Sequence, residues 1–260
     1  MNHAEDDAGV YYEERGTGSD ALLWIHGFGS STRGWIGMVE AFDDYRSIVI
    51  DLPGFGQSAA AGNGCQIPTL AAAAHGVMAE LGIDQYSVIG ASMGGGVALR
   101  VALDHPEAVR MVIGVVPLPA QGMAGDAADS VLPAFSALYG NAEGLRIAFE
   151  GMSKYPPTAA TDDLVEDACS VNAGTWADWT TGGAAQWSQF DELGSLSMPF
   201  CSILGADDVV LSVTDQLATA AQVCDGRAVV LSGLGHLMED RQRVIDEIRT
   251  SLTVLKVASA

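Results

Sequence analysis

Ser92 lies among small residues in the stretch "SVIGASMGGGVALR", which spans residues 87–100. A short apolar run precedes the serine and a helix-like run follows it, so the pattern predicts a strand-to-helix turn at this point. In that setting G-x-S-x-G, here residues 90–94, holds a serine exposed on a sharp turn, where its hydroxyl can act as a nucleophile. The pattern alone also fits a glycine-rich turn that only packs a helix closely, but the flanking elements favour the nucleophile.

A serine nucleophile needs a base, and the base is usually a histidine that a third group orients. Of the five histidines, His236 in "SGLGHLMED" follows the last predicted strand in a loop flanked by glycine. The other four lie at the terminus, in a helix, after a helix and at the start of the "HGFG" turn: His3, His75, His105 and His26. We interpret His236 as the base, against the alternative of an ordinary histidine in a surface loop.

The orienting acid is expected at the end of another strand. No carboxylate follows the apolar run 111–116 before Asp126, whereas "ADDVV" follows the run "FCSILG". Asp208, the third residue after Gly205, is the favoured acid, and Asp207 is the alternative. The order serine, aspartate, histidine along the chain is the one expected for the α/β-hydrolase arrangement. The two aspartates also fit a solvated turn.

Two backbone N–H groups would have to stabilise the oxyanion that forms when a serine attacks a carbonyl. One is expected from Met93, the residue after the nucleophile, at the positive end of the following helix. The other is expected from Phe28 in the loop "HGFGSS" after the first apolar run, where glycines let the backbone approach a substrate closely. An ordinary glycine turn is the alternative interpretation of this loop.

A scaffold must position these residues, and the chain alternates short apolar runs with helix-like runs. The apolar runs are typical of strands buried on both faces of a parallel sheet, and they span 21–26, 47–51, 87–90, 111–116, 200–205 and 228–233. Helical patterns span 69–82, 95–107, 214–224 (with Thr214 as its expected cap) and 239–257. The segment 9–16 predicts an antiparallel edge hairpin with the residues before it. The predicted fold class is therefore α/β, with a mostly parallel, doubly wound sheet.

The segment 117–197 interrupts this alternation, because it contains several short helix-like runs and no convincing strand. We interpret it as a helical cap inserted between two strands of the sheet. On this interpretation residues 1–116 and 198–260 together form the α/β core.

The motifs in this chain occur together and in a fixed order: "HGFGSS", "DLPGFGQS", "GASMGGG", "GADD" and "GLGH". In this order and at these intervals they resemble the α/β-hydrolase fold superfamily, over nearly the whole chain except the helical insert. Similar members include carboxylesterases, lactonases, carbon–carbon bond hydrolases and perhydrolases. The resemblance implies acyl transfer to water with Ser92, Asp208 and His236 as the triad, and a cap that selects the substrate. A serine nucleophile disfavours haloalkane dehalogenases and epoxide hydrolases, which use aspartate there.

Aromatic side chains in the insert give the best indication of the pocket, although most of them are expected to form the core of the cap. The residues proposed to contact the substrate are Gly27, Phe135, Tyr139, Trp176, Trp187 and Leu237. The insert carries only two basic residues, Arg146 and Lys154. A neutral, moderately apolar carboxylic ester is therefore the expected substrate. Three alternatives remain open: a carbon–carbon bond hydrolase of ring-cleavage products, a lactonase or perhydrolase, and a ligand receptor.

Composition restricts the partners and the compartment. The 33 acidic and 12 basic residues give a net charge of −21, which disfavours binding to nucleic acids and to anionic membranes. The acidic excess fits either a salt-tolerant surface or simple solubility. The four cysteines form no zinc or CxxC pattern, and the acidic N-terminus does not resemble a signal peptide. We expect a cytoplasmic enzyme that acts on a small ester-like molecule, with no cofactor and no metal.

Overall fold

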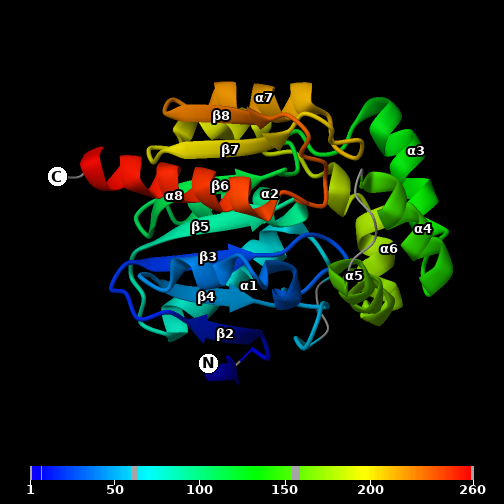
Figure 1. Cartoon of the computed structure of the whole chain (residues 1–260), viewed down its shortest axis with the longest axis horizontal. Coiled ribbons are helices and arrows are strands. Elements are labelled where there is room, and N and C mark those ends of the chain that lie inside the picture. Colours follow the sequence, from blue (N-terminus) through cyan, green and yellow to red (C-terminus); the bar gives the residue numbers. More distant parts are fainter. Residues whose placement is uncertain (1, 7, 60–63, 154–158, 259–260) are drawn as a thin grey trace.

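The computed structural model describes residues 2–6, 8–59, 64–153 and 159–258, and its centre is an eight-stranded sheet (Figure 1). The strand order is β1-β2-β4-β3-β5-β6-β7-β8. β2 pairs antiparallel with both β1 and β4, and all other neighbours are parallel. The strands are β1 (Asn2–Glu5), β2 (Tyr11–Arg15), β3 (Ala21–Ile25), β4 (Arg46–Ile50), β5 (Tyr86–Ala91), β6 (Val109–Val115), β7 (Phe200–Gly205) and β8 (Gly226–Leu231).

Helices cover both faces of this sheet. α8 (Arg241–Ala258) lies in front of the strands in Figure 1, and α1 (Ile67–Glu80) and α2 (Met93–Asp104) lie behind them. α7 (Val213–Gln222) packs beside β7 and β8 and adds Ala220 to the same buried cluster as α1 and α2. The 3₁₀ helices η1 (Thr32–Trp35) and η2 (Val39–Phe42) pack with α8. The arrangement is the predicted doubly wound α/β fold.

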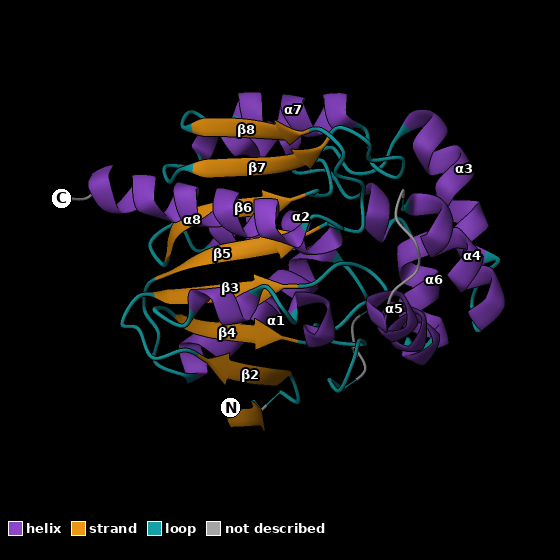
Figure 2. Ribbon diagram, in the orientation of Figure 1, coloured by secondary structure: helices purple, strands orange, loops and turns teal. Residues whose placement is uncertain are grey.

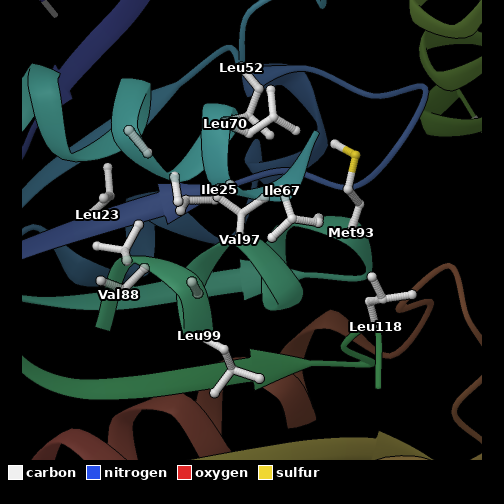
Figure 3. Packing of buried hydrophobic residues seen from close by; sticks show 14 of the residues in the cluster. Leu23, Ile25, Leu52, Ile67, Leu70, Val88, Met93, Val97, Leu99 and Leu118 are labelled. Atoms are coloured by element: carbon white, nitrogen blue, oxygen red, sulfur yellow. The ribbon is translucent and has the colours of Figure 1, made fainter. Parts of the chain in front are cut away.

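Successive side chains of the central strands alternate between two buried clusters, because neighbouring residues of a strand point to opposite faces. In β3, Leu23 and Ile25 join the cluster with α1 and α2, whereas Leu22 and Trp24 join the cluster with α8. Figure 3 shows the first cluster, in which Ile25 lies near Val97 of α2. The uninterrupted apolar runs of the sequence therefore do correspond to strands buried on both faces.

Four further helices stand beyond the ends to which the parallel strands point (Figure 2). They are α3 (Gly125–Ser136), α4 (Ala142–Met152), α5 (Ala159–Ser170) and α6 (Ala173–Thr180), and the 3₁₀ helices η3 (Ala184–Gln186) and η4 (Phe190–Ser195) lead back to β7. No strand lies in the described part of the segment 117–197. Throughout the described residues, no helix has both the length and the apolar character that crossing a bilayer requires.

Most elements agree with the sequence prediction, including the edge hairpin of β1 and β2. The capping prediction for α7 was wrong: Ser212, rather than Thr214, accepts a hydrogen bond from the N–H of Asp215 at 3.2 Å. Ser212 lies two residues before Thr214 and supplies the same kind of side-chain oxygen, which accepts a hydrogen bond from an N–H group in the first turn of the helix. α2 also begins earlier than predicted, at Met93, so the serine immediately precedes the helix.

Candidate active site

Ser92 occupies the turn between β5 and α2 in a backbone conformation that side chains rarely adopt. Its φ is 49° and its ψ is −120°, and a non-glycine residue held at positive φ is strained. Two hydrogen bonds to residues outside the turn and α2 hold it there: its N–H donates to the Val115 carbonyl at 3.1 Å, and its carbonyl accepts from the Leu118 N–H at 2.8 Å. Both partners belong to β6 or to the residues just after it, so the neighbouring strand fixes the turn.

The glycines around Ser92 are required by close backbone contacts. A Cβ on Gly90 would lie 2.1 Å from the Gly94 carbonyl oxygen, and a Cβ on Gly94 would lie 2.3 Å from the Ile25 carbonyl oxygen. The two further glycines pack against the chain that leaves β6: a Cβ on Gly95 would lie 2.4 Å from Pro117, and one on Gly96 would lie 3.1 Å from Leu118. Small residues therefore let α2, β3 and residues 117–118 meet around the serine.

Gly94→Ala should destabilise the protein, because the carbonyl that the new methyl meets is fixed in β3. We expect the free energy of unfolding to fall by at least about 1–3 kcal/mol, measured by urea denaturation. The matched control is Gly76→Ala in α1, where a Cβ meets nothing within 4 Å. That change should raise the free energy of unfolding by about 0.5–1 kcal/mol. A Gly94→Ala protein as stable as the wild type would contradict the packing described here.

His236 connects the serine to a buried carboxylate. Its Nε2 lies 3.0 Å from Ser92 Oγ, and its Nδ1 lies 3.0 Å from Asp208 Oδ2. Only 10% of the His236 side chain and 0% of the Asp208 side chain is exposed. Of the two aspartates that the sequence left open, Asp208 is therefore the one that meets the histidine. Asp207 is held by its backbone N–H, which donates to the Leu234 carbonyl at 3.0 Å.

Asp208 is fixed by the turn that follows β7. Its Oδ1 accepts from the N–H groups of Val210 and Leu211 at 2.8 and 3.0 Å, which leaves Oδ2 for His236. Burial acts to raise the pKa of this carboxyl. The positive charge of His236, its hydrogen bond and the two backbone amides act in the opposite direction and outweigh burial, so the pKa of Asp208 is lowered. Asp208 therefore stays ionised when the histidine is charged.

The loop after β3 reaches the serine with its backbone. A Cβ on Gly27 would lie 3.1 Å from Ser92 Cβ, so Gly27 lies directly against the nucleophile. The next residue is Phe28, whose ring stacks on Trp179 with centroids 5.3 Å apart. Within the described residues, the Phe28 N–H donates to no acceptor, and Met93, as the first residue of α2, has an N–H without a partner inside the helix.

Two residues that the sequence analysis did not single out as functional hold this loop. Asp51 follows β4 and accepts from the N–H groups of Thr32 and Gln57 at 2.6 and 2.8 Å. His26 is buried: its Nδ1 lies 2.7 Å from the Gly27 carbonyl, and its Nε2 accepts from the Leu52 N–H at 3.0 Å. The position of each polar residue directly after an apolar strand is the signal that could have identified both.

The hydrogen bonds of His26 require a neutral ring, with a proton on Nδ1 and a lone pair on Nε2. Burial lowers the pKa of His26, although the charge of Asp51 and the Gly27 carbonyl act in the opposite direction. Since the unfolded chain takes up this proton near pH 6.5, the stability from neutral His26 should be complete above about pH 6.5 and decrease as the pH falls. The loss should approach about 1.4 kcal/mol per pH unit.

NMR titration of the histidine rings tests this directly, with urea denaturation at each pH. The His26 ring should still be neutral at pH values where an exposed histidine is already mostly protonated. A His26 signal that titrates near pH 6.5 in the folded protein would contradict the assignment.

A cavity of about 570 Å³ opens above Ser92 and His236. The residues proposed as substrate contacts divide into two groups: Gly27, Phe135 and Leu237 line this cavity, whereas Tyr139, Trp176 and Trp187 do not. Trp176 is buried against Phe28 and Phe135, and its Nε1 donates to the Phe135 carbonyl at 3.1 Å. Tyr139 packs on Trp176 from the outside with 46% of its surface exposed. Trp187 packs against the core.

Further apolar side chains in the cavity wall come mostly from the helices beyond the sheet. They include Met123, Leu132, Phe149, Met152, Leu164 and Trp179, and Val210 and Leu211 come from the loop that carries Asp208. Sequence periodicity could not separate these from other buried residues of the same helices, because both groups are apolar and lie on inward faces. The cavity is suited to a substrate with a sizeable apolar part.

An ion-pair cluster joins α5 to the chain just after the loop with Phe28. Arg33 donates to Asp163, to Glu166 at 2.9 Å and to Asp167 at 3.0 Å, and Ser31 Oγ donates to Asp167 at 2.6 Å. Burial raises the pKa of Asp167, although Ser31 and Arg33 oppose the change. The cluster therefore fixes one wall of the cavity to the loop that carries the Phe28 amide.

Residues 20–149, half of the chain, match the sequence model of the family described as "alpha/beta hydrolase fold". The chain belongs to the α/β-hydrolase fold family. This confirms the resemblance seen in the motifs, and the strand order and the flanking helices agree with it.

Relatives of this α/β hydrolase include enzymes that act on different bonds. It is 28% identical over 256 residues to a 2-hydroxy-6-oxononadienedioate/2-hydroxy-6-oxononatrienedioate hydrolase from a Pseudomonas species, covering 91% of this chain and 88% of that protein. It is 30% identical over 245 residues to a pimeloyl-[acyl-carrier protein] methyl ester esterase from Aeromonas hydrophila, covering 87% and 92%. A solved esterase from Rhodococcus sp. ECU1013 has the same fold, with a TM-score of 0.85 at 24% identity over 98% of each chain.

Proposed function

We propose that this α/β hydrolase cleaves neutral, moderately apolar carboxylic esters through an acyl-enzyme on Ser92. The observation that carries the proposal is the continuous path of contacts from Ser92 Oγ through His236 to Asp208 at the base of an apolar cavity. A serine, a histidine and a buried carboxylate in this order are the arrangement that activates a hydroxyl for attack on a carbonyl.

In the first half of the reaction, His236 Nε2 takes the proton of the Ser92 hydroxyl as its oxygen attacks the ester carbonyl. His236 then gives this proton to the departing alcohol, and the acyl group stays on Ser92. In the second half, His236 removes a proton from water as the water oxygen attacks the acyl carbon. The bond from that carbon to Ser92 Oγ then breaks, His236 returns the proton to Ser92 Oγ, and the acid leaves. Asp208 keeps the Nδ1–H of the imidazole oriented and stabilises its charged form in both halves.

The negative charge on the carbonyl oxygen would be stabilised by the N–H groups of Phe28 and Met93. Gly27 lies against Ser92, which brings the Phe28 amide near the reacting carbonyl, and the Met93 amide opens α2. Preorganised donors of this kind are worth about 3–4 kcal/mol each in the transition state. The strained backbone at Ser92 is a part of the same preorganisation.

We further propose that residues 117–197 act as a cap over a core of residues 1–116 and 198–260. The helices α3 to α6 supply apolar side chains to the cavity, and Arg33 fixes α5 to the core. A cap that supplies the cavity wall would select the substrate by the size and shape of its apolar part.

A second candidate is hydrolysis of a carbon–carbon bond beside a ketone, because a relative that covers most of the chain is named as a hydrolase of an oxononadienedioate. The same serine, histidine and aspartate could serve that reaction. The esterase from Aeromonas hydrophila supports the ester reaction equally. The lactonase, perhydrolase and receptor interpretations have less support, and the intact set Ser92, His236 and Asp208 argues against a receptor.

Hydrolysis of p-nitrophenyl esters with acyl chains of two to twelve carbons tests the ester proposal, and a vinylogous diketone tests the second candidate. A serine-reactive phosphonate should label one residue, Ser92, in proportion to the activity lost. Turnover of the diketone with no turnover of any ester would overturn the first proposal in favour of the second. Labelling at a different serine would overturn the site.

A further inference from the structure

Arg241 places a positive charge on the wall of the cavity that holds Ser92 and His236. It is the first residue of α8, and it lines the cavity together with Leu237 and Met238, which connect it to the histidine along the chain. Its side chain is half-buried. The charge therefore lies on the wall from which His236 reaches the serine.

Arg241 differs from most of the other arginines, because within the described part of the chain it forms no ion pair with a carboxylate. In a chain with 33 acidic and 12 basic residues, carboxylates are available almost everywhere. Eight arginines form ion pairs: Arg15, Arg33, Arg46, Arg100, Arg110, Arg146, Arg243 and Arg249. Among the described residues only Arg227 and Arg241 do not, and Arg227 is an exposed side chain on the edge strand β8.

The surroundings of Arg241 do not explain an arginine at this position by stability alone. One of its N–H groups donates to the Ile36 carbonyl, whereas a guanidinium has five such donors. Burial lowers the pKa of Arg241, and the charge of Glu40 opposes this change without reversing it. The Glu40 carboxylate itself accepts from Arg15 at 2.8 Å and from the Gly37 N–H at 2.7 Å. A cation in the first turn of a helix is also unfavourable.

Most of the other charged groups of the described cavity wall already have partners. Arg33 is surrounded by Asp163, Glu166 and Asp167, so both aspartates that line the cavity have a cation beside them. Glu239 accepts from the Gly235 N–H at 3.1 Å through Oε2, whereas its Oε1 is buried without a hydrogen-bond partner among the described residues. Arg241 is thus the cation of the described wall whose donors are still available to a bound molecule.

We propose that Arg241 binds a carboxylate on the part of the substrate that leaves with the proton of His236. The leaving side follows from the chemistry, since His236 must protonate the leaving group and Arg241 lies on the same wall. The inference rests on the proposed ester hydrolysis and refines it: the preferred substrate is an otherwise apolar ester whose alcohol part carries an acid group. We expected a neutral substrate because the segment 117–197 carries only two basic residues. Arg241 lies outside that segment, at the start of the C-terminal helix α8.

Matched pairs of aryl acetates test this proposal. In each pair the phenol carries, at its 3-position, either a carboxylate or the neutral carboxamide, attached directly or through one or two methylene groups. For at least one spacing, the wild type should have a kcat/KM for the carboxylate above that for the amide. Arg241→Gln should lower kcat/KM for that carboxylate by about 10- to 100-fold and change kcat/KM for the amide by less than about twofold. Arg241→Lys should keep a part of the preference for the carboxylate, because lysine retains the positive charge but lacks the planar guanidinium that can make two parallel hydrogen bonds to a carboxylate.

Arg243→Gln is the matched control, because it removes the same charge two residues away from a side chain that is paired with Asp240 and does not line the cavity. It should leave both substrates unchanged. No preference at any spacing, an equal loss on both substrates in Arg241→Gln, or the same loss in Arg243→Gln would each overturn the proposal.

A binding measurement separates this proposal from ester hydrolysis itself. If the wild type hydrolyses none of these acetates, the proposed function fails, and the carboxylate site is then tested by calorimetry with the corresponding hydroxyaryl carboxylates. They should bind Ser92→Ala at least 10-fold more tightly than they bind Ser92→Ala/Arg241→Gln. Equal affinity for the two proteins would overturn the role of Arg241.

Discussion

Ser92→Ala should lower kcat/KM for p-nitrophenyl esters by roughly 10⁴- to 10⁶-fold, because no other group in the cavity replaces the attacking oxygen. The fold should be retained, since among the described residues the Ser92 hydroxyl is hydrogen-bonded to His236 alone, and the backbone hydrogen bonds of the turn do not involve the side chain. Ester hydrolysis with purified protein and a thermal unfolding curve measure both quantities. Near wild-type activity in a preparation free of wild-type protein would exclude Ser92 as the nucleophile.

Two further serine variants sharpen this test. Ser195→Ala removes a hydroxyl that donates to the Glu192 carbonyl in η4, on an exposed residue, and should leave activity unchanged. Ser92→Gly also removes the nucleophile, but it relieves the backbone at φ 49°. We therefore expect Ser92→Gly to be more stable than Ser92→Ala by about 1 kcal/mol. Equal stability of the two variants would indicate that the turn is not strained.

Asp208→Asn should lower kcat by roughly 10³- to 10⁴-fold with little change in KM. The asparagine oxygen would still accept from the amides of Val210 and Leu211, so its NH₂ group would face His236 Nδ1. The imidazole would then accept at Nδ1 and carry its proton on Nε2, where it could no longer take the proton of the serine. Steady-state kinetics at saturating ester measure the effect.

The neighbouring aspartate provides the control for this prediction. Asp207→Asn removes the same charge from the same turn, and it should change kcat by less than about threefold because Asp208 is the residue at 3.0 Å from the histidine. A larger loss in Asp207→Asn than in Asp208→Asn would reverse the assignment. Since the pKa of Asp208 is lowered, the stability it contributes is complete above about pH 4 and is lost only as the pH falls further.

The local signals in the sequence were strong because they arise from short-range geometry. A strand buried on both faces must be apolar throughout. The serine between the strand and the helix must be flanked by Gly90 and Gly94, because a Cβ on either residue would lie only 2.1–2.3 Å from a backbone oxygen. These requirements concern consecutive residues, so Ser92 and the alternation of strands and helices could be predicted. The same holds for the position of His236 in the loop after the last strand.

The pocket could not be predicted in the same way, because its members share composition with residues that only pack. Phe135 and Trp176 lie on neighbouring helices and contact one another, yet only Phe135 lines the cavity. The Arg33 cluster joins residues separated by 130 or more positions in the chain. Contacts over such separations leave no periodic pattern in a single sequence.

A single sequence was therefore enough to predict the fold class, the serine, the histidine and the two aspartates between which the acid had to be chosen. The packing of the elements was needed to show that Asp208 meets His236, that His26 and Asp51 hold the loop of Phe28, and that Arg241 lines the cavity without forming an ion pair among the described residues. This difference arises because a residue's type and neighbours set its local conformation, whereas its partners across space depend on how whole elements pack.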